Sequence, residues 1–76
     1  MITVRYFAGA RAAAGVAEVR LPAGSTIASL AETADARLAQ VLKVSTYLVD
    51  GVAWHDRQAP LPAGCTLDVL PPFAGG

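Results

Sequence analysis

A chain of 76 residues has room for one small domain, and its six basic and six acidic side chains leave no net charge with which to attract nucleic acid. No apolar run approaches the roughly 20 residues that span a bilayer, and no basic segment followed by an apolar stretch marks a secretory leader. The single cysteine excludes an internal disulfide, so we expect a cytoplasmic protein in a reducing compartment, with neither nucleic acid nor membrane as a partner.

The first third of the chain predicts two paired strands. Residues 2–7 alternate between two faces, as a half-buried strand does. Residues 8–15 are rich in alanine and predict a turn with a short helical piece that ends at Gly15. Residues 16–21 then predict a second strand that returns antiparallel to the first.

One long helix is expected from residue 26 to about residue 43. Thr26 is the predicted N-cap, because its hydroxyl can accept a hydrogen bond from a free N–H of the first turn. Ser29 stands where a full capping box has Glu or Gln, so we expect no complete box. The apolar side chains recur at a spacing of three or four residues and form one helical stripe, which consists of Ile27, Leu30, Ala34, Leu38 and Val41.

The remaining strands complete a two-layer domain. Residues 47–49 and 52–54 flank Asp50-Gly51, a pair that favours positive φ and predicts a tight hairpin turn. Residues 67–70 predict the last strand, which Pro71 ends because proline has no N–H for a ladder. The order predicts an α+β fold of the ubiquitin-like β-grasp type, a mixed sheet covered by one main helix, with the first and last strands adjacent and parallel.

We divide the chain into a β-grasp domain, residues 1–70, and a flexible C-terminal diglycine tail, residues 71–76. Without a Cβ, Gly75 and Gly76 can enter a channel too narrow for side chains, so we interpret the terminal carboxylate as the functional group. Ordering the last four residues would cost about 4–8 kcal/mol in backbone entropy. Pro71-Pro72 is already stiff and loses little on binding. An ordinary frayed end is the alternative interpretation.

The strand alternation also predicts a docking surface. Phe7 and Leu70 have the opposite parity to the core positions of their strands, so both should lie outside the helix-covered core. Trp54 is a candidate neighbour, since tryptophan is enriched at binding hot spots. The alternative is that Phe7 and Leu70 only cover the ends of a small core. The full set of expected partner contacts is Phe7, Trp54, Leu70, Pro71, Pro72, Phe73 and Ala74.

No metal site and no free-standing catalytic site are expected. Cys65 lacks a His and an Asn or Asp in a recognisable arrangement that could activate it as a nucleophile, so we expect it to be a small buried residue. His55 has one carboxylate beside it, Asp56, where a metal site needs three or four ligands. Lys43 is the only lysine, so it is the only side-chain amine that could accept a second copy of the chain.

The whole chain resembles the small subunit of molybdopterin synthase, within the sulfur carriers. Residues 1–7, Thr26-Ile27, the turn at 61–64 and the ending at 70–76 carry the resemblance, and the most specific part is Pro-Pro followed by two residues and Gly-Gly. The thiamine-pathway carriers share the fold and the diglycine but usually lack the double proline. They are the nearest alternative.

The resemblance implies that partners act on Gly76. An E1-like adenylyltransferase that uses ATP and Mg would adenylate its carboxylate, and a sulfur donor protein would convert it to a thiocarboxylate. The tail would enter the large subunit of molybdopterin synthase, with Gly75 as the slim approach, and give up sulfur for the dithiolene of the molybdenum cofactor. This chain would bind no cofactor and would not be catalytic alone.

Two other function classes are weighed against the sulfur carrier. One is a ubiquitin-like tagging module that joins Gly76 to lysines of target proteins. The other is a free-standing enzyme, which the lack of paired catalytic groups disfavours.

Overall fold

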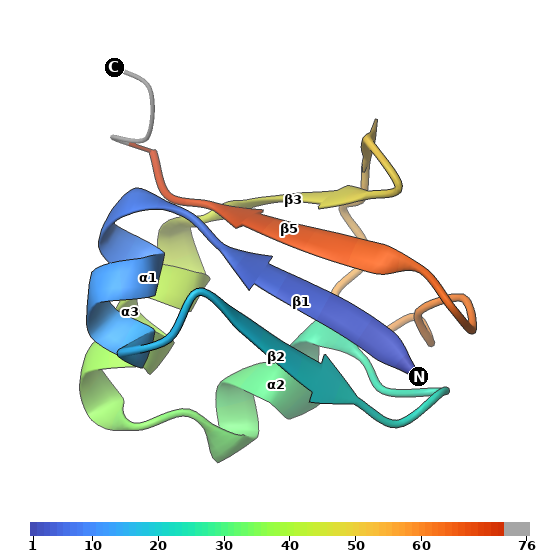
Figure 1. Cartoon of the computed structure of the whole chain (residues 1–76), viewed down its shortest axis with the longest axis horizontal. Coiled ribbons are helices and arrows are strands. Elements are labelled where there is room, and N and C mark those ends of the chain that lie inside the picture. Colours follow the sequence, from blue (N-terminus) through green and yellow to red (C-terminus); the bar gives the residue numbers. More distant parts are fainter. Residues whose placement is uncertain (73–76) are drawn as a thin grey trace.

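The computed structural model describes residues 1–72 of the chain. Over that range it consists of one sheet with helices packed against it (Figure 1). In chain order the elements are β1 (Ile2–Tyr6), α1 (Ala8–Ala14), β2 (Glu18–Leu21), α2 (Ile27–Thr33), α3 (Ala36–Val44), β3 (Thr46–Val49), β4 (Val52–Ala53) and β5 (Thr66–Leu70).

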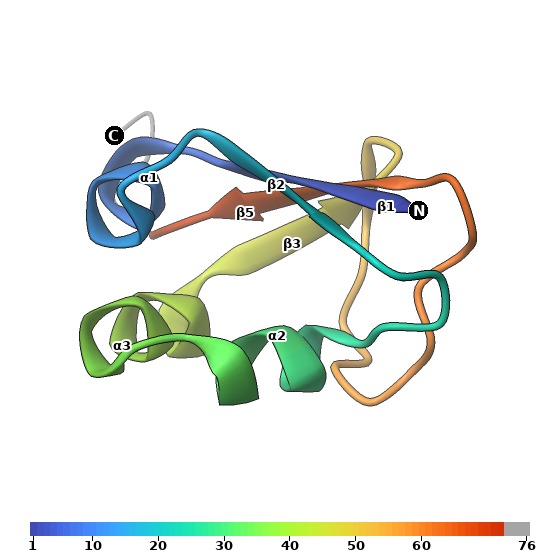
Figure 2. The ribbon, with the colours of Figure 1, turned by 60° about the horizontal axis from the view of Figure 1, so that its bottom comes forward.

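The five strands have the order β2-β1-β5-β3-β4, so the last strand in the sequence lies at the centre of the sheet. β1 pairs with β5 in parallel, and the other three pairs are antiparallel. The expected contact between the first and last strands is confirmed. The β-grasp arrangement is confirmed as well, because α2 and α3 lie across one face of this mixed sheet (Figure 2). We call that face the inner face and the opposite one the outer face.

The single helix expected from residue 26 to 43 is wrong, because two helices occupy that segment. Ala34 is extended, with φ −76° and ψ 150°, and ends α2. Asp35 then caps α3, since its carboxylate accepts a hydrogen bond from the Leu38 N–H at 2.8 Å. An aspartate that bonds the backbone in this way starts a new helix in place of continuing the old one. The apolar stripe runs on across the break, so its periodicity did not reveal it.

Thr26 is the N-cap of α2, as predicted, but the expectation of an incomplete capping box is wrong. The Thr26 hydroxyl accepts from the Ser29 N–H at 3.0 Å, and the Ser29 hydroxyl accepts from the Thr26 N–H at 3.0 Å. A serine hydroxyl therefore reaches the N-cap amide here as a glutamate would.

The short elements occur where they were predicted, and the bounds of the strands differ from the predicted ones by one or two residues. Gly15 ends α1 in the left-handed conformation, and Asp50 and Gly51 both have positive φ, as a tight hairpin turn requires. β2 begins at Glu18, two residues later than expected. Residues 16 and 17 instead connect the Gly15 cap to the ladder.

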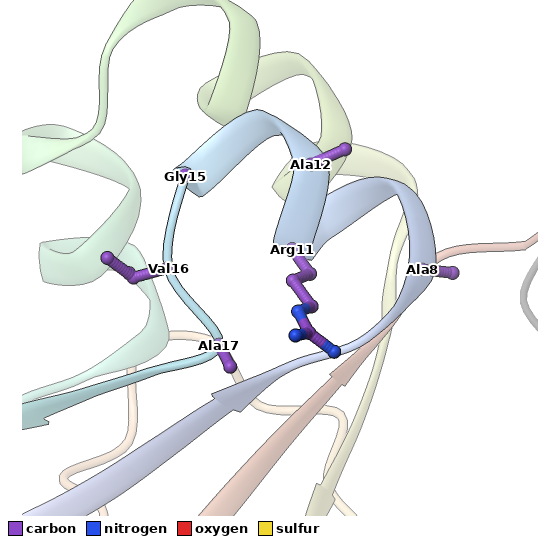
Figure 3. A pocket seen from close by; sticks show the side chains of 6 residues that line it. All are labelled: Ala8, Arg11, Ala12, Gly15, Val16 and Ala17. Atoms are coloured by element: carbon purple, nitrogen blue, oxygen red, sulfur yellow. The ribbon is translucent and has the colours of Figure 1, made fainter.

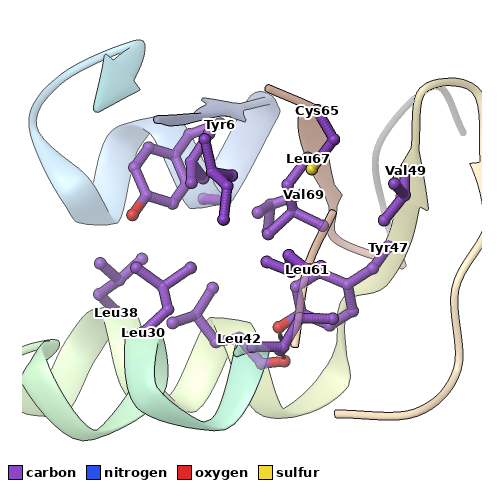
Figure 4. Close-up of a cluster of buried hydrophobic side chains, with 14 residues drawn as sticks. Tyr6, Leu30, Leu38, Leu42, Tyr47, Val49, Leu61, Cys65, Leu67 and Val69 are labelled. Carbon is purple, nitrogen blue, oxygen red and sulfur yellow. Dashed lines mark hydrogen bonds between the residues drawn. The ribbon is translucent and has the colours of Figure 1, made fainter. Parts of the chain in front are cut away.

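The core lies between the helices and the inner face of the sheet (Figure 4). Alternate strand positions supply it, which confirms the predicted alternation. Cys65 is buried, as expected, and burial raises the pKa of its thiol. The largest fully buried side chains are Ile2, Val4, Ile27, Leu42, Leu61, Leu67 and Val69.

A buried tyrosine hydroxyl links the sheet to the helix layer. The Tyr47 hydroxyl donates a hydrogen bond to the Leu42 carbonyl at 2.6 Å, so β3 is held to the last turn of α3. Burial raises the pKa of Tyr47 to about 12. The Arg57 guanidinium also lies over the Tyr47 ring, 5.1 Å from its centroid.

Candidate partner-docking site

The outer face carries the predicted docking residues Phe7 and Leu70 side by side. The Phe7 N–H donates to the Val69 carbonyl at 3.2 Å, so Phe7 continues β1 alongside the end of β5. Phe7 is 36% exposed and Leu70 is half-buried, whereas Tyr6 and Val69 are buried in the core. Both residues thus lie where the strand parity places them. No helix within residues 1–72 covers this face.

Trp54 is not their neighbour. Its backbone N–H donates to the Tyr47 carbonyl at 2.9 Å, and the register places Leu48 opposite Ala53. Trp54 is therefore opposite Tyr47, and the two side chains share the inner face. Its ring packs against the buried cluster, and its indole N–H donates to the Asp56 carbonyl at 3.0 Å. The structure therefore separates Trp54 from Phe7 and Leu70 by the thickness of the sheet.

Three further side chains belong to this part of the outer face. The sequence reasoning did not include them in the docking surface, although strand parity assigns each of them to the outer side of its strand. Leu48 is half-buried on β3, and its register partner on β5 is Asp68. Asp68 is in turn the register partner of Arg5 on β1. We call the resulting surface the outer patch; it consists of Arg5, Phe7, Leu48, Asp68 and Leu70.

An ion pair lies within the outer patch. The Arg5 Nε donates to Asp68 Oδ1 at 2.7 Å and Nη2 donates to Oδ2 at 3.0 Å, which is a two-point fork. These hydrogen bonds and the charge of Asp68 raise the pKa of Arg5. The Arg5 guanidinium carbon also lies 5.4 Å from the centroid of the Phe7 ring. The pair neutralises its own charge and touches an apolar residue of the same patch.

The tail continues from the edge of the outer patch. Pro71 is buried and Pro72 is exposed. Burial of Pro71 leaves Pro72 as the first tail residue that is open to a partner. The other predicted tail contacts, Phe73 and Ala74, and the predicted reactive residues, Gly75 and Gly76, lie outside the described residues.

Two shallow pockets lie at α1, and one of them reaches the outer patch. One, of about 420 Å³, lies between α1 and the segment that leads to β2, and the Arg11 side chain extends across it (Figure 3). A second, of about 220 Å³, shares Arg11 and reaches Arg5 and Phe7. Neither pocket is lined by a Ser, Thr or Cys side chain that could act as a nucleophile, or by a His side chain that could act as its base.

Residues 1–72 contain no cluster of three or more His, Cys, Asp or Glu side chains able to hold a metal ion. His55 is exposed in the loop after β4. Among the helices of this part of the chain, none is both long enough and apolar enough to cross a bilayer.

Comparison with solved structures finds the same fold in several proteins. A putative molybdopterin converting factor, subunit 1, from Pyrococcus furiosus is 26% identical, with 93% of this chain and 95% of that chain covered and a TM-score of 0.67. A chain of the complex of subunits 1 and 2 of molybdopterin-converting factor from Helicobacter pylori is 19% identical, with coverages of 99% and 97% and a TM-score of 0.72. SAMP1 from Haloferax volcanii is 22% identical, with coverages of 99% and 98% and a TM-score of 0.66.

At 19% and 22% identity, the Helicobacter pylori and Haloferax volcanii structures show that the fold is shared and no more. A search of curated proteins found no match. The ThiS family, in contrast, matches residues 4–76. Because this match covers nearly the whole chain, the protein belongs to the ThiS family of sulfur carriers.

Proposed function

We propose that this protein is the small subunit of a molybdopterin synthase and carries sulfur as a thiocarboxylate on Gly76. The observation that carries the proposal is the position of the outer patch, a partly exposed surface of apolar side chains and one ion pair beside the end of β5, from which the tail continues. A surface placed there can hold a partner while the tail enters it. The likeness to a putative molybdopterin converting factor subunit 1, at 26% identity, supports this choice of pathway.

The partner that receives the tail is the large subunit of the synthase. The Helicobacter pylori neighbour is described as a complex of subunits 1 and 2, which supports a two-subunit assembly for the fold. Ordering four tail residues costs about 4–8 kcal/mol, and burying one large apolar side chain contributes about 1.5–3 kcal/mol. Phe7 and Leu70 are already partly covered, so they offset part of this cost and the rest comes from Phe73 and the wider outer face.

The chemistry on Gly76 is supplied by partners. Its carboxylate attacks the α-phosphorus of ATP on an E1-like adenylyltransferase that also holds Mg, which releases pyrophosphate and leaves an acyl adenylate. Sulfide delivered by a sulfur donor protein then attacks the acyl carbon, AMP leaves, and the thiocarboxylate remains on Gly76. This chain contributes the acyl carbon, the unobstructed approach along Gly75 and the docking surface. We place these steps in the cytoplasm.

Intact-mass analysis of the protein isolated from its own cells tests the proposal. We expect a form in which sulfur replaces one oxygen at Gly76, and co-purification with the large subunit. A variant that lacks Gly76, or that carries an added alanine after it, is the matched control and should lose both the sulfur and the synthesis of the cofactor.

Other results would point to the alternatives. Isopeptide-linked adducts on target lysines, with no sulfur on Gly76, would replace the proposal with protein tagging. Sulfur on Gly76 together with a thiazole-forming partner, and no binding to the synthase large subunit, would assign the chain to the thiamine pathway.

A further inference from the structure

The fork between Arg5 and Asp68 spans the two parallel strands at the middle of the sheet. The two residues are direct register partners on β1 and β5, so neither side chain has to reach along the strand to form the two contacts at 2.7 and 3.0 Å. A planar guanidinium held at two points has one orientation. The Arg5 side chain is therefore fixed relative to the strand that leads into the tail.

This fork differs from the other ion pair on the same face. Arg20 and Glu18 of β2 meet in one contact of 3.7 Å, and their side chains are 67% and 48% exposed. An exposed ion pair of that kind contributes little to the stability of the folded state. The Asp68 side chain is only 13% exposed, so its carboxylate is already largely covered by its surroundings.

The fork leaves Arg5 with unused donors. A guanidinium has five N–H groups, and Asp68 accepts from two of its nitrogens, Nε and Nη2. The remaining donors have no hydrogen-bond partner within residues 1–72, and half of the side chain is exposed on the outer face. These N–H groups are open to a molecule that covers the outer patch.

The charges around Arg5 define what such a molecule must offer. Asp68 is hydrogen-bonded to Arg5, Glu18 is the register partner of Arg5 on β2, and Arg11 lines the pocket that reaches Arg5. Two acidic and two basic side chains thus surround the free donors, so a charged group on the partner, of either sign, would meet like charges among them. A neutral oxygen, such as a main-chain carbonyl, can accept from the free N–H groups without either repulsion.

Arg5 also supports the aromatic residue of the patch. Its guanidinium lies 5.4 Å from the centroid of the Phe7 ring, and Phe7 is 36% exposed. A side chain that is held in place before binding loses less entropy when the partner covers it. The fork thus acts on Phe7 through Arg5.

We propose that Arg5, fixed by Asp68, is a positioning and specificity residue of the docking surface: it holds the Phe7 ring and donates to a neutral carbonyl oxygen of the synthase large subunit. This inference rests on the proposed function, because it names how that partner is recognised.

The first test uses the free protein. Hydrogen exchange of arginine Nε–H groups, followed by NMR, should show slower exchange at Arg5 than at Arg20. Asp68→Asn should remove most of the difference. Equal exchange at the two arginines in the wild-type protein would overturn the proposed fixation.

The second test measures the affinity of the full chain for the purified large subunit by calorimetry, with thermal stability followed in parallel. Arg5→Leu and Arg5→Lys should each weaken binding by about tenfold, since lysine keeps the charge but not the planar fork. Arg20→Leu is the matched control on the same face and should change affinity by less than about twofold.

The exchanged variant, Arg5→Asp with Asp68→Arg, separates positioning from simple ion pairing. It can re-form an ion pair and should recover stability, but it moves the donors to β5 and should not recover affinity. Wild-type affinity in Arg5→Leu or in the exchanged variant would overturn the inference and leave the proposed function intact. Failure of the wild-type protein to bind the large subunit would overturn both.

Discussion

The two faces of the sheet are made from the same strands but differ in burial and in charge. On the inner face, alternate residues such as Val4 and Leu67 are fully buried under the helices. On the outer face, Phe7 stays 36% exposed, and the charged pair Arg5–Asp68 neutralises itself. Inner positions therefore determine whether the domain folds, and outer positions are free to determine what it binds. Changes on the inner face should therefore act mainly on stability, and changes on the outer face mainly on binding.

The largest effect is expected from the core side of β5. Leu67→Ala removes a fully buried side chain and should lower the free energy of unfolding by about 2–5 kcal/mol, measured by urea denaturation. Leu70→Ala, on the outer side of the same strand, is the control and should cost less than half as much. Equal losses at the two positions would show that the outer patch is part of the core.

The next largest effect concerns binding. Phe7→Ser should weaken association with the large subunit by about tenfold or more, while changing the free energy of unfolding by no more than about 1 kcal/mol. Trp54→Ala is its counterpart on the inner face and should lower stability while leaving the affinity close to that of the wild type. The opposite pattern, with binding lost only in Trp54→Ala, would restore Trp54 as a docking residue.

Alkaline pH should loosen the link between the layers. The pKa of folded Tyr47 is about 12, above the ordinary value of 10.0, so the folded state holds its proton more tightly than the unfolded state. Stability from this group is present below pH 10 and is lost as the pH rises towards 12. Urea denaturation at several values across that window should show the decline. Tyr47→Phe should start less stable and decline less; the same slope in both proteins would exclude Tyr47 as a cause.

The smallest effect is expected at the break between the helices. Asp35→Ala removes the carboxylate that caps α3 and should lower the free energy of unfolding by about 1 kcal/mol. Glu32→Ala, at an exposed position of α2, should change it by less than about 0.5 kcal/mol. If Asp35→Ala were neutral, the break would not depend on this cap.

Sequence reasoning succeeded where one residue determines the outcome locally. Alternation assigned Phe7 and Leu70 to the outer side, and Asp50-Gly51 predicted the hairpin. It was wrong where a competing local bond decides, as at Asp35, whose side chain caps a new helix inside an unbroken apolar stripe.

The patch itself needed the register between strands. The pairing of Arg5 with Asp68 depends on how β1 and β5 align. Because the two residues are 63 positions apart in the sequence, no local pattern indicates this alignment. The face of Trp54, in contrast, could have been derived. A two-residue turn at Asp50-Gly51 sets Leu48 opposite Ala53, and this register places Trp54 with Tyr47.

The central position of β5 has a consequence for how the protein is made. A nascent chain of only residues 1–64 lacks β5, so the antiparallel pairs β1–β2 and β3–β4 have no strand between them to complete the sheet. Isolated two-stranded hairpins are marginal in water. We therefore expect a fragment ending at residue 64 to be unfolded by circular dichroism, so that incomplete chains do not compete with finished carriers for the partner. A folded fragment would disprove this.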